Sequence, residues 1–218
     1  MVKPIALIVY GVAFLAAAAV CAGQERVDVG LFSQKALEQW EEKEFADQTR
    51  YRLVEDDPRG WVLEARSDGT ASGLVRELEV DLEVTPQLNW SWKVGKLPPG
   101  GDERTKPGDD YAARVYVIFS VGPWFWDTRA LNYVWSADQT LGDTWPNAFT
   151  DKACMFVVQS GDEAIGRWVE EKHDVREDIF KCYGIRPDTI GAVAVMTDSD
   201  NGGGSAIAYY GDIYFSAE

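Results

Sequence analysis

Short segments of alternating side chains, separated by turn residues, constrain the fold of this chain more than any other feature. Such segments recur from residue 49 to residue 215, and the connections between them are rich in Gly, Pro, Asp and Asn. The run Asp56-Asp57-Pro58-Arg59-Gly60 is typical of a turn, so the segments on either side of it are expected to form a hairpin. The pattern predicts an all-β protein built as an antiparallel β-sandwich or jelly roll.

The expected elements are mostly strands, which agrees with a content of nine Trp, nine Tyr and nine Phe. The predicted strands are 49–55, 61–67, 73–80, 86–94, 112–121, 130–135, 153–160, 168–174, 191–197 and 206–215. A helix is expected at 175–183, because apolar residues share one of its faces and Gly184 follows it. A second short helix or turn is expected within 31–45. With no linker and no repeat of fixed period, residues 23–218 are predicted to form one domain.

The N-terminal segment 1–22 has the layout of a signal peptide. Lys3 precedes an apolar run, and small residues lead up to Ala22. Cleavage after Ala22 predicts a periplasmic or secreted protein that keeps no membrane segment. Two alternatives stay open, namely an uncleaved membrane anchor and a lipid attached at Cys21.

The net charge of −15 argues against nucleic acids and anionic lipid surfaces as partners. Downstream of the leader the chain keeps Cys154 and Cys182, and export would permit a disulfide between them. The sequence leaves that pairing open. Two thiols and a single histidine argue against a zinc site. The histidine, His173, lies in a charged stretch and is expected to be solvated.

Period-two geometry assigns faces to the strands. In the strand that begins near residue 112, Val115, Val117 and Phe119 are expected to point into the core. In the last strand, Ile213 and Phe215 are expected to point inward together with Tyr209. The predicted outer face, which is either solvent surface or a ligand-binding groove, therefore holds Asp110, Arg114, Tyr210 and Asp212.

Paired acids give two further candidate sites. The run Asp198-Ser199-Asp200-Asn201-Gly202 is similar to half of a calcium loop, but it lacks the third ligand and the distal Glu of an EF-hand. A calcium site of another kind and a turn held by Asp and Asn side chains both remain. Asp109 and Asp110 are adjacent, so in a strand they would point to opposite faces and would not act on one substrate.

Several motifs occur in a fixed order and together resemble a known family. They are Trp90-Ser-Trp-Lys-Val94, Gly108-Asp-Asp-Tyr-Ala-Ala-Arg-Val-Tyr-Val117, Leu131-Asn-Tyr-Val-Trp135, Trp145-Pro-Asn147, Ala192-Val-Ala-Val-Met-Thr-Asp198, Asp200-Asn201 and Ala208-Tyr-Tyr-Gly-Asp212. The chain resembles the bacterial domain of unknown function 3047 family over about residues 30–217. The resemblance implies a fold like the galactose-binding jelly rolls, which are common among carbohydrate-binding modules, and it implies no catalytic residues.

The sequence favours a non-catalytic binding module for a small molecule or a saccharide, with no cofactor other than calcium. Trp124 and Trp126, in a loop, are candidates for stacking on sugars. The candidate ligand-binding residues are Asp110, Arg114, Trp135, Trp145, Asn147, Asp198, Asp200, Tyr210 and Asp212. Two alternatives stay open: a glycan hydrolase that uses Asp110, Asp198 or Asp212 as acid and base, and an assembly partner of the cell envelope with an acidic interface.

Overall fold

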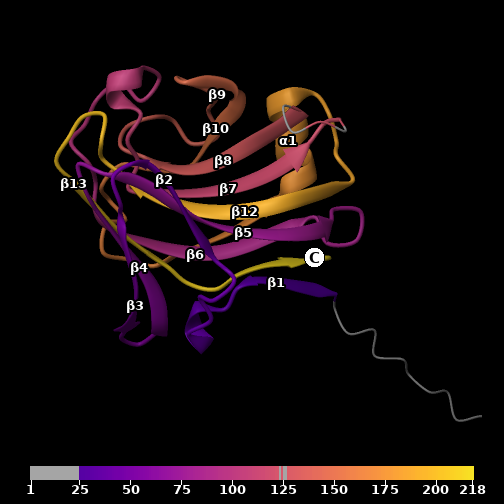
Figure 1. Ribbon diagram of the computed structural model, residues 1–218, viewed down its shortest axis with the longest axis horizontal. Coiled ribbons are helices and arrows are strands. Elements are labelled where there is room, and N and C mark those ends of the chain that lie inside the picture. Colours follow the sequence, from indigo (N-terminus) through magenta and orange to yellow (C-terminus); the bar gives the residue numbers. More distant parts are fainter. Residues whose placement is uncertain (1–24, 123, 125–126) are drawn as a thin grey trace, which may run out of the picture.

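A computed structural model describes residues 25–122, 124 and 127–218, which fold into two facing β-sheets and one short helix (Figure 1). The all-β sandwich expected from the sequence is thus confirmed. The segment 1–22, which we interpret as a leader, lies outside the described residues. No helix within the described part of the chain is long and apolar enough to cross a membrane.

The first sheet, here called sheet I, contains seven strands. The strand order is β1 (Arg26–Gly30), β14 (Ile213–Ser216), β6 (Gln87–Lys96), β13 (Ser205–Tyr210), β4 (Gly60–Asp68) and β3 (Arg50–Asp56). The seventh strand, β11 (Val169–Asp174), also pairs with β6. The hairpin predicted around residues 56–60 is formed by β3 and β4. Arg50 stands opposite Arg66 at its open end, and Asp56 stands opposite Gly60 at the turn. All pairings within this sheet are antiparallel.

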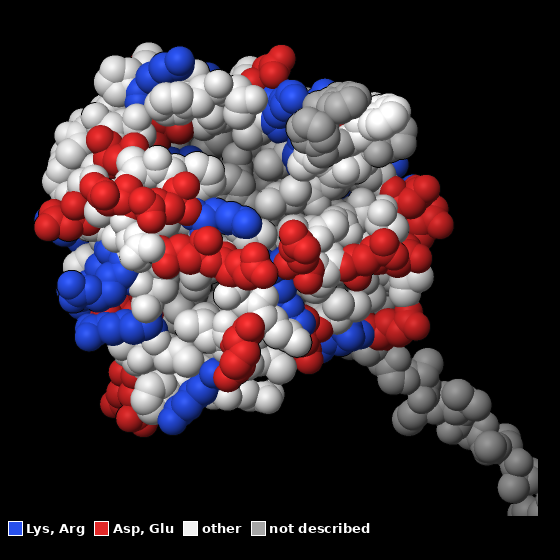
Figure 2. All heavy atoms as spheres, viewed as in Figure 1, with Lys and Arg blue, Asp and Glu red and all other residues white. Residues whose placement is uncertain are grey.

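The second sheet, sheet II, also contains seven strands. The strand order is β2 (Glu41–Ala46), β5 (Ala71–Asp81), β12 (Thr189–Asp198), β7 (Ala113–Ser120), β8 (Thr128–Ser136), β10 (Thr150–Ser160) and β9 (Thr144–Asn147). Only β8 and β10 pair in parallel. The edge strand β2 carries exposed Glu and Lys side chains, which oppose pairing with another chain. Figure 2 shows acidic side chains spread across the middle of this view, in keeping with the net charge.

The helix α1 spans Val175–Tyr183, the range expected from the sequence. Its N-cap, Asp174, accepts a hydrogen bond from the backbone N–H of Glu177, which satisfies a donor that the first turn leaves free. Gly184 ends the helix in the left-handed conformation that Gly adopts at little cost. Two 3-10 turns, η1 at Phe32–Gln34 and η2 at Lys106–Gly108, are the other helical segments among the described residues.

Large aromatic side chains fill the space between the sheets. Trp90 and Trp92 of β6 meet at a ring-centroid distance of 5.4 Å, and Trp92 contacts Trp135 of β8 at 5.9 Å. The inward set expected for β7, namely Val115, Val117 and Phe119, is buried in this core. Each fully buried aromatic side chain contributes about 2 to 3 kcal/mol through removal of apolar surface from water.

His173 is packed among aromatic rings, so its interpretation as a solvated residue is wrong. Its ring lies 4.9 Å from Tyr133, 5.5 Å from Trp90 and 5.9 Å from Phe156. Its Nδ1 lies 2.9 Å from the Asp178 carboxylate. Burial lowers the pKa of His173, but the carboxylates of Asp178 and Glu171 outweigh that effect and raise the pKa to about 9. Period-two sequence patterns could not show this, because Asp178 comes from α1.

A disulfide joins Cys154 of β10 to Cys182 of α1, with an S–S distance of 2.07 Å. The two residues are 28 positions apart in the chain. The bond therefore ties the helix to sheet II. The sequence had left this pairing open.

Candidate functional site

A hollow lies on the outer face of sheet II, with a volume of about 440 Å³. It is lined by Phe45, Ala71, Asp109, Arg114, Tyr116, Asn132, Asn147, Phe149, Thr150, Ala153, Met196, Asp198, Asp200 and Asn201. The central strands β12, β7 and β8 supply the floor, and β2 and the β9–β10 hairpin supply the sides. In Figure 2 the surface is hollowed in the upper part of the view, on the side where Figure 1 shows β9.

Arg114 and Asp198 form the centre of the floor. Arg114 Nε donates to Asp198 Oδ1 at 2.9 Å, and Nη2 donates to Oδ2 of the same carboxylate. Nη2 also donates to the backbone carbonyl of Asp109 at 2.7 Å, and Nη1 donates to the Tyr116 hydroxyl at 3.2 Å. Both Arg114 and Asp198 are buried, so this pair holds β7 and β12 at a fixed spacing beneath the hollow.

Burial dominates the electrostatics of this floor. It raises the pKa of the Asp198 carboxyl to about 7, and the Arg114 guanidinium opposes that rise. Burial would lower the pKa of Arg114, but Asp198 outweighs it, so the pKa is raised and the guanidinium stays charged. Burial also raises the pKa values of the Asp109 and Asp200 carboxyls. The buried charges of Arg114 and Asp198 therefore stabilise each other, and removal of either one would leave the other buried without a counter-charge.

Asn147 connects the side of the hollow to its floor. Its Nδ2 donates to both oxygens of the Asp109 carboxylate, at 3.0 and 2.8 Å. Its Oδ1 accepts the backbone N–H of Phe149 at 3.0 Å, which positions the Phe149 ring at the rim. Phe149 is 54% exposed and Phe45, across the hollow on β2, is 72% exposed. Two exposed aromatic rings thus flank a polar floor.

Asn132 has an unused hydrogen-bond acceptor. The residue lies on β8 opposite Tyr116 of β7, lines the hollow, and is only 1% exposed. Its Nδ2 lies 3.4 Å from the sulfur of Met155, whereas its buried Oδ1 has no hydrogen-bond partner among the described residues. A buried acceptor without a partner costs about 1 to 3 kcal/mol, which a ligand hydroxyl could recover.

Three carboxylates converge beside the hollow, where the sequence suggested calcium. The ligand oxygens of Asp110, Asp198 and Asp200 all lie within 4.8 Å of one another. However, the Asp110 oxygens accept the backbone N–H groups of Asn201 at 3.0 Å and Gly202 at 2.6 Å, and both Asp198 oxygens face Arg114. These contacts match the alternative of a turn held by side chains. Calcium occupancy stays a prediction.

The structure brings together four of the nine candidate residues in the hollow, namely Arg114, Asn147, Asp198 and Asp200. Asp110 adjoins them by closing the Asn201–Gly202 turn. The remaining four, Trp135, Trp145, Tyr210 and Asp212, do not line the hollow.

Tyr210 is fully buried between the sheets, so its placement on an outer face is wrong. Its hydroxyl donates to the Met196 carbonyl at 2.7 Å and accepts the backbone N–H of Arg114 at 3.3 Å. Tyr209, expected in the core, points outward and is only partly buried. The reason is the interruption at Gly211 and Asp212: β13 ends at Tyr210 and β14 begins at Ile213, which reverses the alternation.

Asp212, Trp135 and Trp145 have structural contacts. Asp212 accepts hydrogen bonds from the backbone and hydroxyl of Ser33, at 2.8 and 2.5 Å, and so fixes η1 to sheet I. Trp135 is a core residue whose Nε1 donates to the Gly161 carbonyl. Trp145 packs in a small second cluster on the outer face of sheet II, beside the hollow. Trp124 is 59% exposed in the β7–β8 connection, and Trp126 lies outside the described residues.

Asp109, Asn132, Phe149 and Phe45 are among the residues of the hollow that the sequence did not single out as candidates. Asp109 was set apart from Asp110 by strand alternation, but β7 begins only at Ala113, so alternation does not apply there. Asn132 carried a usable signal, since it is the one strongly polar residue in the otherwise apolar stretch 130–135 of β8. The two Phe residues carry no signal that separates them from core residues.

Comparison with solved structures shows a shared fold. The chain is similar to a family 30 carbohydrate-binding module of a cellulosomal cellulase of Clostridium thermocellum, with 9% identity and a TM-score of 0.50, over 89% of this chain and 98% of that one. It is similar to the endoglucanase Cel12A from Rhodothermus marinus, with 12% identity and a TM-score of 0.48, over 88% and 96%.

A third similar structure is the glycoside hydrolase domain of Endo-D from Streptococcus pneumoniae, with 16% identity and a TM-score of 0.41, over 82% of this chain. The chain spans only 22% of the length of that structure. Comparison with curated proteins found no match. The sequence matches a family model, "Protein of unknown function (DUF3047)", over residues 38–214. Since the match covers most of the 218 residues, the chain belongs to this family.

Proposed function

We propose that this protein is an exported, non-catalytic saccharide-binding protein whose ligand occupies the hollow of sheet II. The observation that carries the proposal is the unpartnered Oδ1 of Asn132, buried in a hollow whose rim presents two exposed Phe rings. Sites for small ligands are concave and combine apolar walls with a few placed polar groups. The hollow of sheet II has this composition.

Polar groups of the floor suit sugar hydroxyls. A hydroxyl is both donor and acceptor, so it can donate to Asn132 Oδ1 and accept from a neighbouring amide or guanidinium. Asp109 and Asp200 offer further carboxylate oxygens at the surface of the hollow. The rigid Arg114–Asp198 pair beneath them keeps these groups in place without ligand, which reduces the entropy lost on binding.

Aromatic rims suit sugar rings. The faces of Phe45 and Phe149 can cover the apolar C–H surface of a pyranose, and two platforms on opposite sides favour an oligosaccharide over a single sugar. The net charge of −15 and the acids in the hollow favour a neutral glycan. The shared fold with a family 30 carbohydrate-binding module supports this proposal at the level of architecture only.

Export is part of the proposal. The leader-like segment 1–22 would direct the chain to the periplasm or the medium, where glycans are available and the Cys154–Cys182 disulfide persists. Fractionation of expressing cells, with mass spectrometry of the mature N-terminus, tests it. A mature chain that starts at Gly23 is expected, and a full-length chain in the membrane fraction would contradict the proposal.

A glycan array with the purified protein tests the binding function. We expect binding to neutral oligosaccharides, with the affinity lowered about tenfold or more in Asn147→Ala, because this change releases both Asp109 and the Phe149 backbone. Gln34→Ala is the matched control, since it removes an exposed amide from η1, in the connection between β1 and β2. A broad array without signal would count against the proposal.

Glycan hydrolysis is the second candidate, favoured by the raised pKa values of Asp109 and Asp200, which both line the hollow. A carboxyl with a raised pKa can act as a general acid. Both oxygens of Asp109 already accept hydrogen bonds from Asn147, which weakens it in that role. Release of reducing ends from a bound glycan, abolished in Asp109→Asn while binding persists, would establish this second function.

A further inference from the structure

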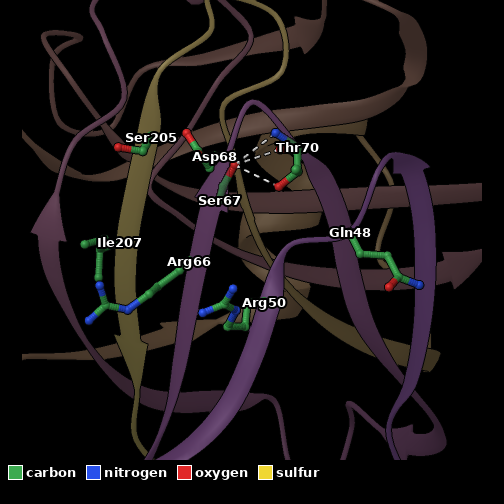
Figure 3. A pocket seen from close by; sticks show the side chains of 8 residues that line it. All are labelled: Gln48, Arg50, Arg66, Ser67, Asp68, Thr70, Ser205 and Ile207. Atoms are coloured by element: carbon green, nitrogen blue, oxygen red, sulfur yellow. Dashed lines mark hydrogen bonds between the residues drawn. The ribbon is translucent and has the colours of Figure 1, made fainter.

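A second pocket lies on the other sheet, on the outer face of sheet I, with a volume of about 360 Å³. It is lined by Gln48, Arg50, Arg66, Ser67, Asp68, Thr70, Ser205 and Ile207, and we call it the arginine pocket. Figure 3 shows Arg50 and Arg66 on the neighbouring strands β3 and β4, with Asp68 and Ser205 above them. None of these residues lines the hollow of sheet II.

Cations are concentrated along one row of this sheet. Arg50 of β3 stands directly opposite Arg66 of β4, Arg66 stands opposite Ile207 of β13, and Ile207 stands opposite Lys96 of β6. Lys96 Nζ donates to the hydroxyl of Ser205, which lines the pocket. Three cations thus share one cross-strand row in a chain whose net charge is −15.

Two like charges directly opposite each other on antiparallel strands destabilise a sheet unless something neutralises them. Glu64 neutralises Arg66, at 2.8 Å, and also pairs with Arg52. Arg50 is exposed and makes no ion pair or side-chain hydrogen bond with another described residue. Arg50 therefore brings into the pocket a positive charge that has no ion-pair partner among the described residues.

The rest of the lining identifies the class of ligand. Beside the guanidinium groups stand an amide from Gln48, the Ser205 hydroxyl and the Asp68 carboxylate, all suited to hydroxyl groups. A guanidinium binds carboxylate and phosphate oxygens through paired hydrogen bonds. A bare oxyanion would leave most of a 360 Å³ pocket unfilled. A large polyanion would be repelled by the surrounding acids, whereas a small anion responds mainly to charges within about 8 Å.

We infer that the arginine pocket binds a small sugar acid or sugar phosphate, a polyhydroxylated ring with one oxyanion. The oxyanion lies against Arg50 and Arg66, and the ring hydroxyls contact Gln48, Asp68 and Ser205. This site is distinct from the neutral-glycan site on sheet II, because no residue lines both and the two linings differ in the sign of their net charge.

NMR titration of the ¹⁵N-labelled protein at constant ionic strength tests the inference, with glucuronate, glucose 6-phosphate and glucose as probes. We expect saturable shifts at residues 48–50, 66–70 and 205–207 with glucuronate or glucose 6-phosphate, and none with glucose. The response to each anion tells whether the oxyanion is a carboxylate or a phosphate. Arg50→Ala should weaken that binding about tenfold, and Arg186→Ala, which removes an exposed cation elsewhere, should leave it unchanged.

Three results would overturn the inference: no saturable shift at these residues with either anion, equal binding of glucose, or unchanged affinity in Arg50→Ala. Shifts confined to residues of the hollow on sheet II would also overturn it, while leaving the proposed glycan function intact. Arg50 is exposed and bonds to no other side chain, so its replacement is not expected to unfold the protein.

Discussion

Arg114 and Asp198 form a buried, two-pronged ion pair that joins β7 to the end of β12, 84 residues further along the chain. The same guanidinium reaches the Asp109 carbonyl, so one side chain fixes the strand, the loop before it and the floor of the hollow. Arg114 is therefore a structural residue under the site. Loss of binding in Arg114→Ala alone would not distinguish contact with ligand from collapse of the floor.

Removal of one partner of this pair should destabilise the protein strongly. We expect Arg114→Met to lower the free energy of unfolding by about 3 to 5 kcal/mol, because it leaves the Asp198 carboxylate buried without a counter-charge. Urea denaturation followed by tryptophan fluorescence measures this. The double variant Arg114→Met/Asp198→Leu should recover part of the lost free energy of unfolding, because neither charge is then buried alone. In the double-mutant cycle, additive effects of the two changes would contradict the pairing.

The sequence predicted the sandwich well because two signals agreed, namely turn residues and alternation within strands. Val115, Val117 and Phe119 pointed inward as expected, since β7 is regular from Ala113 to Ser120. The prediction failed at Tyr210, where two residues outside the ladder reversed the alternation. Alternation says nothing about where a strand is interrupted.

The site was predicted only in part because most of its contacts join distant segments. Arg114, Asp198, Asp200 and Asn147 were selected as polar residues in or beside strands, and the structure brings them together. The acid that pairs with Arg114, Asp198, was not predicted from the sequence. Register between β7 and β12 decides this pairing, and a single sequence does not give register.

The disulfide between Cys154 and Cys182 should stabilise the fold. Replacement of both residues by Ser is expected to lower the free energy of unfolding by about 3 to 4 kcal/mol, from the chain entropy of a loop of 28 residues. Guanidinium denaturation of the variant measures it, with the reduced wild type as a second reference. If the oxidised protein and the double Ser variant had the same free energy of unfolding, the disulfide would not stabilise the fold, which would contradict this prediction.

Stability should fall as the pH rises through the range in which His173 titrates. An unfolded His has a pKa near 6.5, and the folded value is raised to about 9, so the folded state holds the proton more tightly. The contribution is fully present below about pH 6.5 and is lost as the pH approaches 9, at about 3 kcal/mol in all.

Denaturation curves from pH 6 to 10 for wild type and His173→Gln measure this effect. Glu103, whose pKa burial raises to about 7, changes stability in the same direction, but it does so in both proteins and cancels in the comparison. The difference between the proteins should shrink as the pH rises. A difference that stays constant with pH would contradict a charged His173 between Asp178 and Glu171.

The rim aromatics should contribute to glycan affinity. Phe149→Ala is expected to weaken binding about tenfold, because it removes a stacking surface held beside the hollow by Asn147. Phe180→Ala is the matched control, since Phe180 is also exposed, at 41%, but lies on α1. Isothermal titration calorimetry compares the two. Equal losses in both variants would place the ligand away from the hollow.

Asn132→Leu tests the proposed function most directly, through stability and affinity measured on the same variant. The change removes a buried acceptor that lacks a partner, so we expect unfolding free energy to stay constant or to rise by up to about 1 kcal/mol. Glycan affinity should fall about tenfold or more, since the ligand hydroxyl loses that acceptor. Undiminished affinity in a stably folded Asn132→Leu protein would contradict binding in the hollow of sheet II.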